Sequence, residues 1–283
     1  MNKTFLEVKK ILKDAQIDEA EAKARIIVRE VGHLKFEDML LDKDVENKEE
    51  VLNFAKKLAL SGEPLQYMLG YSYFMGEKFI VTPDTLIPRE ETEFLVRCAI
   101  DKIRNLKTAP NVLEIGTGSG CIACMIAKNL PDIEVLGVDI STNALQVALE
   151  NAQKLDLIRK VIFRKSDVFS SIRDGEKFDL IVSNPPYIKK DDYLKLDKTV
   201  LNFEPKSALL AGEDGLEFYI KIINEAKKYL KPSGFIAFEC AQGQADDICG
   251  LFEQRGFEVC DVICDMAGIK RVVCAGVKKG VQL

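Results

Sequence analysis

The segment Asn184-Pro185-Pro186-Tyr187 has residue types that could hold an amide or amine nitrogen. It directly follows an apolar run at residues 180–183, which predicts a buried strand that ends where this loop begins. The prolines lack N–H donors, so the Pro185 carbonyl and the Asn184 side-chain oxygen remain available as acceptors. They could grip both hydrogens of an –NH2 group while the Tyr187 ring packs on the planar group that carries it. These four residues are the candidate catalytic and substrate-binding residues.

An amide nitrogen is a poor nucleophile because it shares its lone pair with the carbonyl group, so positioning must do much of the catalysis. Well-oriented reactants gain on the order of 7 to 11 kcal/mol in this way. No strong general base or metal ion is required, since the nitrogen can lose its proton after it has reacted. The alternative is a simple strand-ending turn, as Asn-Pro often is. The position after a predicted parallel strand favours the catalytic interpretation.

A glycine-rich turn earlier in the chain indicates a nucleotide-like ligand. The predicted strand Val112-Leu113-Glu114-Ile115 leads into the sequence G-T-G-S-G, and a helix is predicted from Cys121. Glycines at such a junction let the backbone approach a ligand closely, and the helix start presents free N–H groups. A dinucleotide fingerprint would need glycine at position 121, so a cofactor without pyrophosphate is favoured. The candidate cofactor-binding residues here are Glu114, Gly116, Thr117, Gly118, Ser119 and Gly120.

Acidic residues follow the next two predicted strands. Asp139 comes about 20 residues after the glycines, where a carboxylate can accept hydrogen bonds from both ribose hydroxyls of an adenosine. Its alternative role is to cap the helix that opens near Ser141. Asp167 is placed to meet an adenine amino group. Because all these strand ends share one edge of a parallel sheet, the further candidate cofactor-binding residues are Asp139, Asp167, Val168 and Asn184.

Alternating strand and helix patterns after Arg89 predict a doubly wound, Rossmann-like α/β fold. Strands separated by helices form a parallel sheet that is covered on both faces. No crossover helix fits between the last two strands, so one strand must be antiparallel. We therefore predict a seven-stranded, mostly parallel sheet, with strands at residues 112–115, 135–138, 161–163, 180–182, 235–239, 257–263 and 271–277.

The N-terminal part has a different pattern. From Phe5 to about Leu60, apolar residues recur at helical spacing, which predicts a small helical domain. Between Gly62 and Pro88, aromatic residues and glycines indicate short strands or a hairpin. The predicted divisions are a helical domain at residues 1–72, a β-hairpin linker at 73–88 and an α/β domain at 89–283.

Composition narrows the functional classes. The 283-residue chain has a formal net charge of -5 and lacks a long Lys/Arg run, which argues against binding bare nucleic acid through its phosphates. The N-terminus has no apolar signal-peptide core, and no apolar stretch reaches the ~18 to 20 residues that span a bilayer. The eight cysteines are interpreted as reduced thiols, and the single histidine does not support a multi-histidine metal site. We expect a soluble, cytoplasmic monomer without membrane or direct nucleic-acid partners.

The segments Pro64-Leu65-Gln66-Tyr67 and Leu86-Ile87-Pro88-Arg89, together with the glycine-rich turn and residues 184–187, resemble motifs of the HemK/PrmC family of protein-(glutamine-N5) methyltransferases, which modify the Gly-Gly-Gln loop of peptide-chain release factors. The resemblance covers nearly the whole chain. Asn-Pro-Pro-Tyr alone is shared with adenine-N6 DNA methyltransferases, whereas Pro-x-Gln-Tyr and Leu-Ile-Pro-Arg are far more specific. The matching positions are residues 62–67 with Gly70, 86–89 with Thr92 and Glu93, 114–120, Asp139, Asp167, 184–187, Glu204-Pro205 with Ala208-Leu209, and Gly268 with Arg271.

The resemblance implies a class I methyltransferase domain that moves a methyl group from S-adenosylmethionine to the glutamine side-chain nitrogen N5, leaving S-adenosylhomocysteine and modulating translation termination. It also implies that the helical domain helps hold the release factor, which is the expected partner. One departure is Ala241 after Glu239-Cys240, where relatives often have glycine. It affects only the local packing.

Other functions remain open at this stage. A glutamine methyltransferase for a ribosomal protein would share the fold, cofactor and catalytic loop, and would differ only in the N-terminal recognition region. An adenine-N6 methyltransferase for DNA or RNA would be expected to carry a recognition insertion and a basic face, and this acidic chain shows neither. A non-catalytic cofactor-binding module would be expected to have a degraded loop, whereas residues 184–187 are intact.

Overall fold

The computed structural model, which describes residues 2–106 and 108–278, consists of two units, Met1–Leu69 and Gly70–Leu283. The smaller unit is helical, and the larger one contains every strand of the described residues. The predicted domain bounds of 1–72, 73–88 and 89–283 stay predictions.

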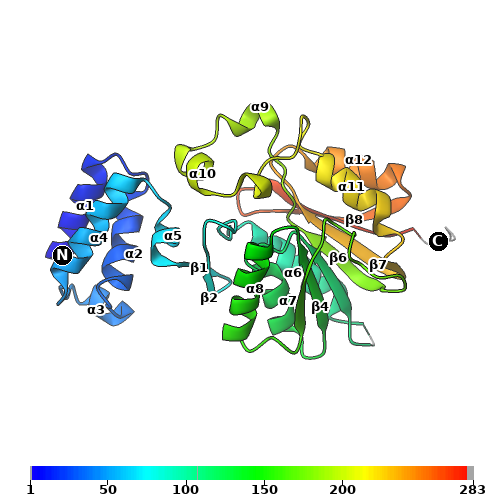
Figure 1. Cartoon of the computed structure of the whole chain (residues 1–283), viewed down its shortest axis with the longest axis horizontal. Coiled ribbons are helices and arrows are strands. Elements are labelled where there is room, and N and C mark those ends of the chain that lie inside the picture. The colour runs from blue at the N-terminus through cyan, green and yellow to red at the C-terminus, as the bar shows by residue number, and fades with distance from the viewer. Residues whose placement is uncertain (1, 107, 279–283) are drawn as a thin grey trace. The chain divides into compact units, whose positions relative to one another are not determined.

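The smaller unit is a group of helices (Figure 1), and apolar residues at helical spacing build its core. Val8 and Leu12 of one helix, Ile27 of the next and Val51 of a third are fully buried in that core. The helical domain predicted from the same periodicity is therefore confirmed. Its helices are α1 (Lys3–Asp14), α2 (Ala20–Glu30), α3 (Phe36–Leu40), α4 (Lys48–Ser61) and α5 (Leu65–Leu69).

A two-stranded hairpin begins the larger unit. Its strands β1 (Tyr71–Phe74) and β2 (Glu77–Ile80) are antiparallel. The connecting Met75 and Gly76 both have positive φ, which matches the right-handed twist of a tight hairpin. Strand β2 ends at Ile80, and residues 81–91 contain no further strand before the next helix, α6 (Thr92–Ile103).

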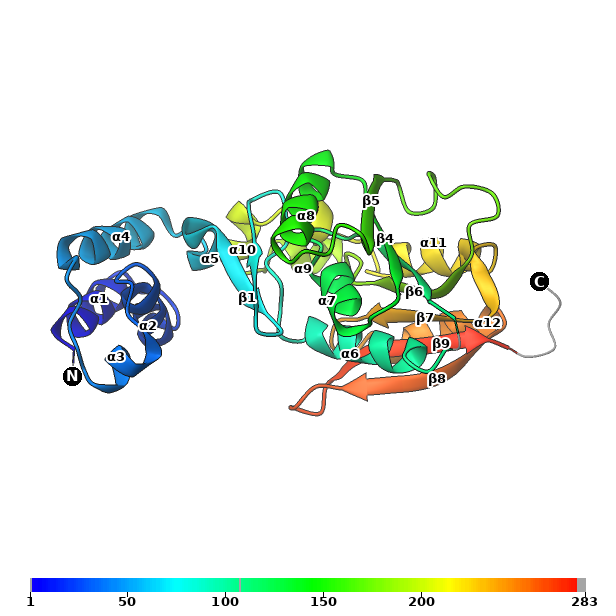
Figure 2. The same cartoon turned by 90° about the horizontal axis from the view of Figure 1, so that it is seen from below.

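The remaining strands form one sheet, which confirms the predicted seven-stranded, mostly parallel arrangement. The strand order is β5-β4-β3-β6-β7-β9-β8. Figure 2 shows β5 and β8 at opposite margins of this sheet. The strands are β3 (Asn111–Ile115), β4 (Glu134–Asp139), β5 (Val161–Lys165), β6 (Phe178–Ser183), β7 (Leu230–Glu239), β8 (Phe257–Cys264) and β9 (Lys270–Val277).

Helices cover both faces of the sheet, because both faces are apolar (Figure 1). One face packs on α6, α7 (Cys121–Asn129) and α8 (Thr142–Lys154), and the other on α11 (Glu217–Ala226) and α12 (Ala245–Gln254). The short helices α9 (Lys190–Tyr193), α10 (Lys198–Phe203) and η1 (Lys206–Ala208) lie in the connection after β6.

The chain reverses its direction of winding between β3 and β6. From β3 it proceeds through β4 to β5 at one margin, then returns to β6 on the other side of β3 and continues to β7. Ligands of doubly wound sheets bind beside such a reversal, at the carboxyl ends of the strands. The predicted antiparallel strand is β9, which lies between β7 and β8 and runs opposite to both.

Candidate functional site

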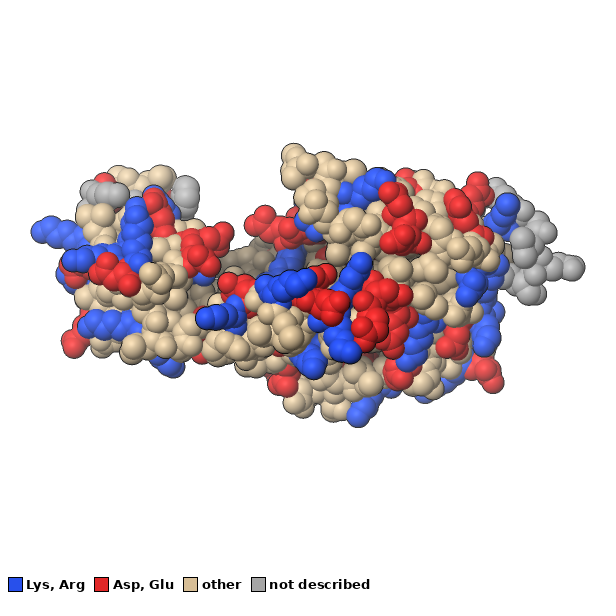
Figure 3. All heavy atoms as spheres, turned by 90° about the horizontal axis from the view of Figure 1, so that it is seen from above, with Lys and Arg blue, Asp and Glu red and all other residues tan. Residues whose placement is uncertain are grey.

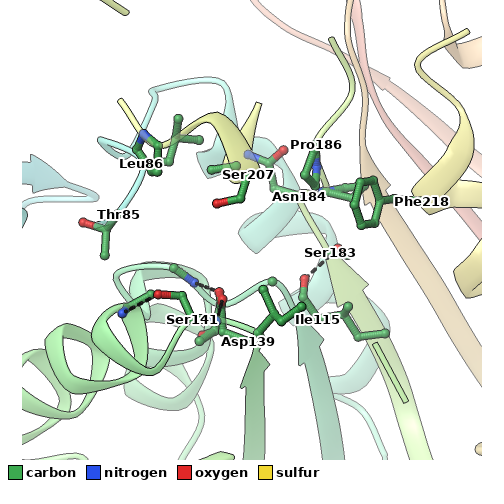
Figure 4. Close-up of a pocket in the computed structure, with 18 of the residues that line it drawn as sticks. Thr85, Leu86, Ile115, Asp139, Ser141, Ser183, Asn184, Pro186, Ser207 and Phe218 are labelled. Carbon is green, nitrogen blue, oxygen red and sulfur yellow. Dashed lines mark hydrogen bonds between the residues drawn. The ribbon is translucent and has the colours of Figure 1, made fainter. Parts of the chain in front are cut away.

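A cavity of about 660 Å³ opens at the carboxyl ends of β3, β4 and β6. Asp139, Ser141 and Ile115 lie on one side of it, and Asn184, Pro186 and Ser207 lie on the other (Figure 4). The structure therefore brings the glycine-rich turn, the acids after β4 and β5, and the predicted catalytic loop to one space. Most predicted site residues line it: Gly116, Thr117, Gly118, Ser119, Asp139, Asp167, Val168, Asn184, Pro185 and Pro186.

The glycine-rich turn needs glycines for its backbone conformation. Gly116, Gly118 and Gly120 all have positive φ, a region that residues with a Cβ rarely adopt. At Gly120 a Cβ would also lie 3.0 Å from the Cβ of Ala148 in α8. Gly120 therefore permits close packing of the turn on α8, and it is not among the residues that line the cavity.

Glu114 lies beneath the turn and not in the cavity wall. Its side chain is fully buried, and Oε2 accepts hydrogen bonds from the Thr117 hydroxyl at 2.5 Å and from the Ala123 N–H at 3.1 Å. Burial raises the pKa of Glu114 to about 8. The observed contacts are with the turn and the start of α7. A direct contact between Glu114 and a cofactor stays a prediction.

Asp139 ends β4 and also anchors the turn. One carboxylate oxygen accepts from the Gly118 N–H and the other from the Ser141 N–H, both at 2.9 Å. The cap of α8 is Ser141, whose hydroxyl accepts from the Ala144 N–H, so Asp139 is not needed for that role. Burial raises the pKa of Asp139. Each of its carboxylate oxygens can still accept another hydrogen bond, from the cavity side.

Asp167 and Val168 follow β5 at the rim of the cavity. The Asp167 carboxylate pairs with the Lys221 ammonium of α11 at 2.7 Å. Val168 is buried and has a φ of 52°, which is unusual for a β-branched residue and marks local backbone strain. Its carbonyl accepts from the Ser166 hydroxyl at 2.8 Å, which helps hold this conformation.

The predicted catalytic loop leaves the sheet where β3 and β6 separate. The Ser183 hydroxyl donates to the Ile115 carbonyl at 2.7 Å and ties the two strand ends together. One residue later, the Asn184 side-chain N–H donates to the Thr92 hydroxyl at 3.4 Å. This contact uses one N–H of the Asn184 amide and orients the side chain. The side-chain oxygen is therefore the group available to a substrate.

Tyr187 is the one predicted catalytic residue that does not line the cavity. It packs against the core formed with α11 and α12, and burial raises the pKa of its hydroxyl to about 12. Its backbone carbonyl accepts from the side chain of the buried Gln244 at 3.1 Å, and the same Gln244 amide donates to Gly215 at 3.2 Å. Gln244 thereby fixes the end of the loop. Contact between the Tyr187 ring and a substrate stays a prediction.

Glu239 does not line the cavity, but it lies beside the lining residues Thr92 and Asn184, and the sequence analysis did not select it. It ends β7 and is buried, and its Oε2 has no hydrogen-bond partner within the described residues. Burial raises the pKa of Glu239 to about 7, while the nearby Thr92 and Asn184 side chains act in the opposite direction. The sequence could have indicated Glu239 in the same way as Asp139, because both are acidic residues at the carboxyl end of a predicted strand.

Asn151 is a second residue that sequence reasoning missed. It is buried in α8, where its side-chain nitrogen donates to the Ser119 carbonyl at 2.9 Å and to the Ile80 carbonyl at 3.0 Å. Its oxygen accepts from the Ile80 N–H at 2.7 Å. One side chain thus joins the hairpin to the glycine-rich turn. A polar residue among apolar helix positions was the only signal for it in the sequence.

The surface of the larger unit carries charges of both signs. On the face seen in Figure 3, Lys and Arg side chains are interspersed with Asp and Glu and do not gather into one basic patch. Within residues 2–106 and 108–278, no helix combines the length and the apolar character needed to cross a bilayer.

Comparisons with known proteins identify both units. Residues 106–271 match the methyltransferase domain model, and residues 5–70 match the PrmC N-terminal domain model. The release factor glutamine methyltransferase of Thermodesulfovibrio yellowstonii is 44% identical over 215 residues, which is 76% of each chain. That of Nitratidesulfovibrio vulgaris is 36% identical and covers 93% of this chain and 90% of its own.

Solved structures support the same fold. The ribosomal protein L11 methylase of Lactobacillus delbrueckii subsp. bulgaricus superposes with a TM-score of 0.51 at 22% identity, over 74% of this chain and 90% of that one. At this identity the likeness concerns the fold alone. The two family models and the sequence relatives identify the family as well as the fold. The chain belongs to the HemK/PrmC family of release factor glutamine methyltransferases.

Proposed function

We propose that this protein transfers a methyl group from S-adenosylmethionine to the side-chain amide nitrogen N5 of the glutamine in the Gly-Gly-Gln motif of peptide-chain release factors. The observation that carries the proposal is the position of Asn184 in the same cavity as Asp139 and the glycine-rich turn. A nitrogen acceptor and an adenosine-containing donor would thus meet in one space. The names of the sequence relatives support the glutamine of a release factor as the acceptor.

The cavity residues fit S-adenosylmethionine. The Asp139 carboxylate has acceptor capacity left for the ribose hydroxyls, and the positive φ of Gly116 and Gly118 would let the backbone approach the amino-acid part of the ligand. Ile140 lines the cavity with 59% of its surface exposed, although it is large and apolar. Such a residue suits contact with the flat face of adenine, whose amino group would donate to Asp167.

Asn184 is the residue that orients the acceptor. Because its N–H donates to Thr92, its side-chain oxygen can accept one hydrogen of the substrate amide, and the Pro185 carbonyl can accept the other. Both acceptors are held by a backbone that two prolines and the Ser183 hydrogen bond keep rigid. The nitrogen lone pair is then directed toward the donor side of the cavity.

The chain contributes position and polarity to the reaction. When bound, S-adenosylmethionine supplies a methyl group that is already activated by its sulfonium centre. The acceptors at Asn184 and Pro185 favour the amide geometry in which positive charge builds up on nitrogen, since both oxygens are negative ends of dipoles. The nitrogen proton can leave after the transfer, so no side chain must act as a strong base.

The test is to incubate the protein with unmodified release factor and methyl-labelled S-adenosylmethionine, and to map the label by peptide mass spectrometry. A ribosomal-protein pool and unmethylated DNA serve as parallel acceptors, and Asn184→Ala serves as the inactive control. We expect label on the glutamine of the Gly-Gly-Gln loop. Label only on a ribosomal protein or on adenine would overturn the proposed substrate, and no label on any acceptor would overturn the catalytic role.

A further inference from the structure

A pair of cysteines lies on β8 and β9, outside the cavity. The pairing of these strands shifts between Val259 and Asp261, which leaves Cys260 as an extra residue in a β-bulge. As a result Cys260 and Asp261 together face Cys274 on β9. The Sγ atoms of Cys260 and Cys274 are 3.7 Å apart, with Cys260 exposed and Cys274 fully buried.

The two thiols have opposite electrostatic surroundings. Hydrogen bonding with Cys274, and then the charge of the nearby Lys102 ammonium, lower the pKa of Cys260 to about 7, although burial and Asp261 act in the opposite direction. Hydrogen bonding with Cys260 and Cys98, together with burial, raises the pKa of Cys274 well above its ordinary value. Cys260 is therefore the thiol of the pair that ionises first as pH rises, and its ionised sulfur is the nucleophile.

Lys102 is fixed in this position by a second contact. It projects from α6, and its ammonium group forms an ion pair with the Asp261 carboxylate. The positive charge therefore stays beside Cys260 as long as the bulge keeps Asp261 next to it. An exposed thiolate with a cation and a second thiol beside it has the features of a peroxide-reactive cysteine.

We propose that Cys260 and Cys274 form a thiol pair that reduces hydroperoxides and closes a disulfide between β8 and β9. The Cys260 thiolate attacks one peroxide oxygen, the O–O bond breaks, and the departing oxygen takes a proton from water, so that Cys260 becomes a sulfenic acid. The Cys274 sulfur then attacks the Cys260 sulfur, the S–S bond forms, the S–O bond breaks, and water leaves with the Cys274 proton. The two thiols lose two electrons in total, and the hydroperoxide gains them.

Other cysteines of the described residues lack this combination. Cys121 and Cys124 are buried in α7, and burial raises the pKa of both thiols, so the C-x-x-C spacing has no redox character. Cys264 is exposed on the same strand as Cys260, but within residues 2–106 and 108–278 it has no hydrogen bond to another sulfur. Cys264 is therefore a matched internal control.

The experiment treats the full chain with a small excess of hydrogen peroxide, blocks the remaining thiols, and maps linked peptides by mass spectrometry without reduction. We expect a Cys260–Cys274 linkage whose rate of formation rises roughly tenfold per pH unit up to about pH 7 and levels off above it. Cys260→Ser should abolish the linkage, and Cys264→Ser should leave its rate unchanged. In Cys274→Ser, oxidation should stop at a Cys260 sulfenic acid that dimedone traps.

Several outcomes would overturn the proposal. Oxidation of Cys264 as fast as Cys260 would show that the surroundings of Cys260 confer no special reactivity. Peroxide consumption without a linkage in the unsubstituted chain would remove Cys274 from the reaction, even if Cys274→Ser does not fold. If the purified protein reacted with peroxide only after a chelator was added, the two cysteines would be ligands of a thiophilic metal ion and not a peroxide-reactive pair.

Discussion

Asn184 and Glu239 occupy neighbouring positions at the carboxyl ends of β6 and β7, because the register of these strands pairs Ser183 with Phe238. Thr92, at the start of α6, contacts the Asn184 amide from the adjacent layer. The residue proposed to orient the substrate is thus itself oriented by two side chains that come from other parts of the chain.

Asn184→Ala is expected to lower the rate of methyl transfer by on the order of 10² or more, by analogy with the loss of one preorganised polar contact to a reacting group. Binding of S-adenosylmethionine should weaken less, because Asp139 and the glycine-rich turn remain. Turnover and calorimetric titration measure the two effects separately. If the substitution abolished cofactor binding but left the turnover per bound cofactor unchanged, the role of Asn184 in orienting the substrate would be contradicted.

Glu239→Gln is expected to change the pH dependence of the reaction. Burial raises the pKa of Glu239 to about 7, and the ionised carboxylate attracts the nearby Asn184 N–H group more strongly than the protonated acid does. The unsubstituted protein should therefore gain rate as pH rises through about 7, mainly in kcat, and Glu239→Gln should lose that rise. Glu258→Gln, at an exposed position of β8, is the control. An identical pH profile in all three proteins would remove Glu239 from the mechanism.

Glu114 is expected to make stability depend on pH. Its pKa is about 8 in the folded protein, against an ordinary value of 4.5 for an exposed glutamate, so the folded state binds the proton more tightly than the unfolded chain does. The contribution of Glu114 to the free energy of unfolding should be largest below about pH 4.5 and should be lost as pH rises through about 8. Glu114→Gln, which resembles the protonated acid, should flatten this fall in urea titrations. Glu134→Gln, exposed on β4, should not.

Asn151→Leu tests the link between the hairpin and the glycine-rich turn. The substitution removes partners from the backbone groups of Ile80 and Ser119, which should lower the free energy of unfolding by roughly 1–3 kcal/mol. S-adenosylmethionine affinity should also fall, because Ser119 would no longer be held. Gln153→Leu, exposed on the same helix, is the matched control. Unchanged affinity in a folded Asn151→Leu protein would show that the turn does not need this link.

Gly137→Ala tests the space beneath the turn. A Cβ there would lie 2.8 Å from the Phe163 ring and 2.9 Å from the Thr117 hydroxyl, so the turn must shift. We expect a loss of about 1–3 kcal/mol of stability and weaker cofactor binding. Gly250→Ala, in α12 with no atom within 4 Å of the new Cβ, should instead stabilise the protein by about 0.5–1 kcal/mol. Thermal unfolding with and without S-adenosylmethionine measures both changes, and equal effects of the two substitutions would refute the steric argument.

The chemical types of the site residues and their places at strand ends could be predicted from the sequence alone. The G-x-G-x-G turn follows an apolar run, and Asn184 follows another, so both had to lie at strand ends whatever the rest of the fold. Parallel strands separated by helices then placed those ends on one edge. The helical character of the N-terminal unit followed equally from the spacing of its apolar residues, since periodicity is a local property.

Which distant residues meet at that edge depends on the tertiary structure. The sheet places β9 between β7 and β8. Thr92 contacts Asn184, and Asn151 contacts Ile80, although these residues lie far apart in the chain. Tyr187 does not line the cavity, although the three residues before it do. Sheet order, register and bulges fix such neighbours, and the local sequence constrains these only weakly. The pairing of Cys260 with Cys274 has the same origin, because one extra residue in β8 brings the two sulfurs together.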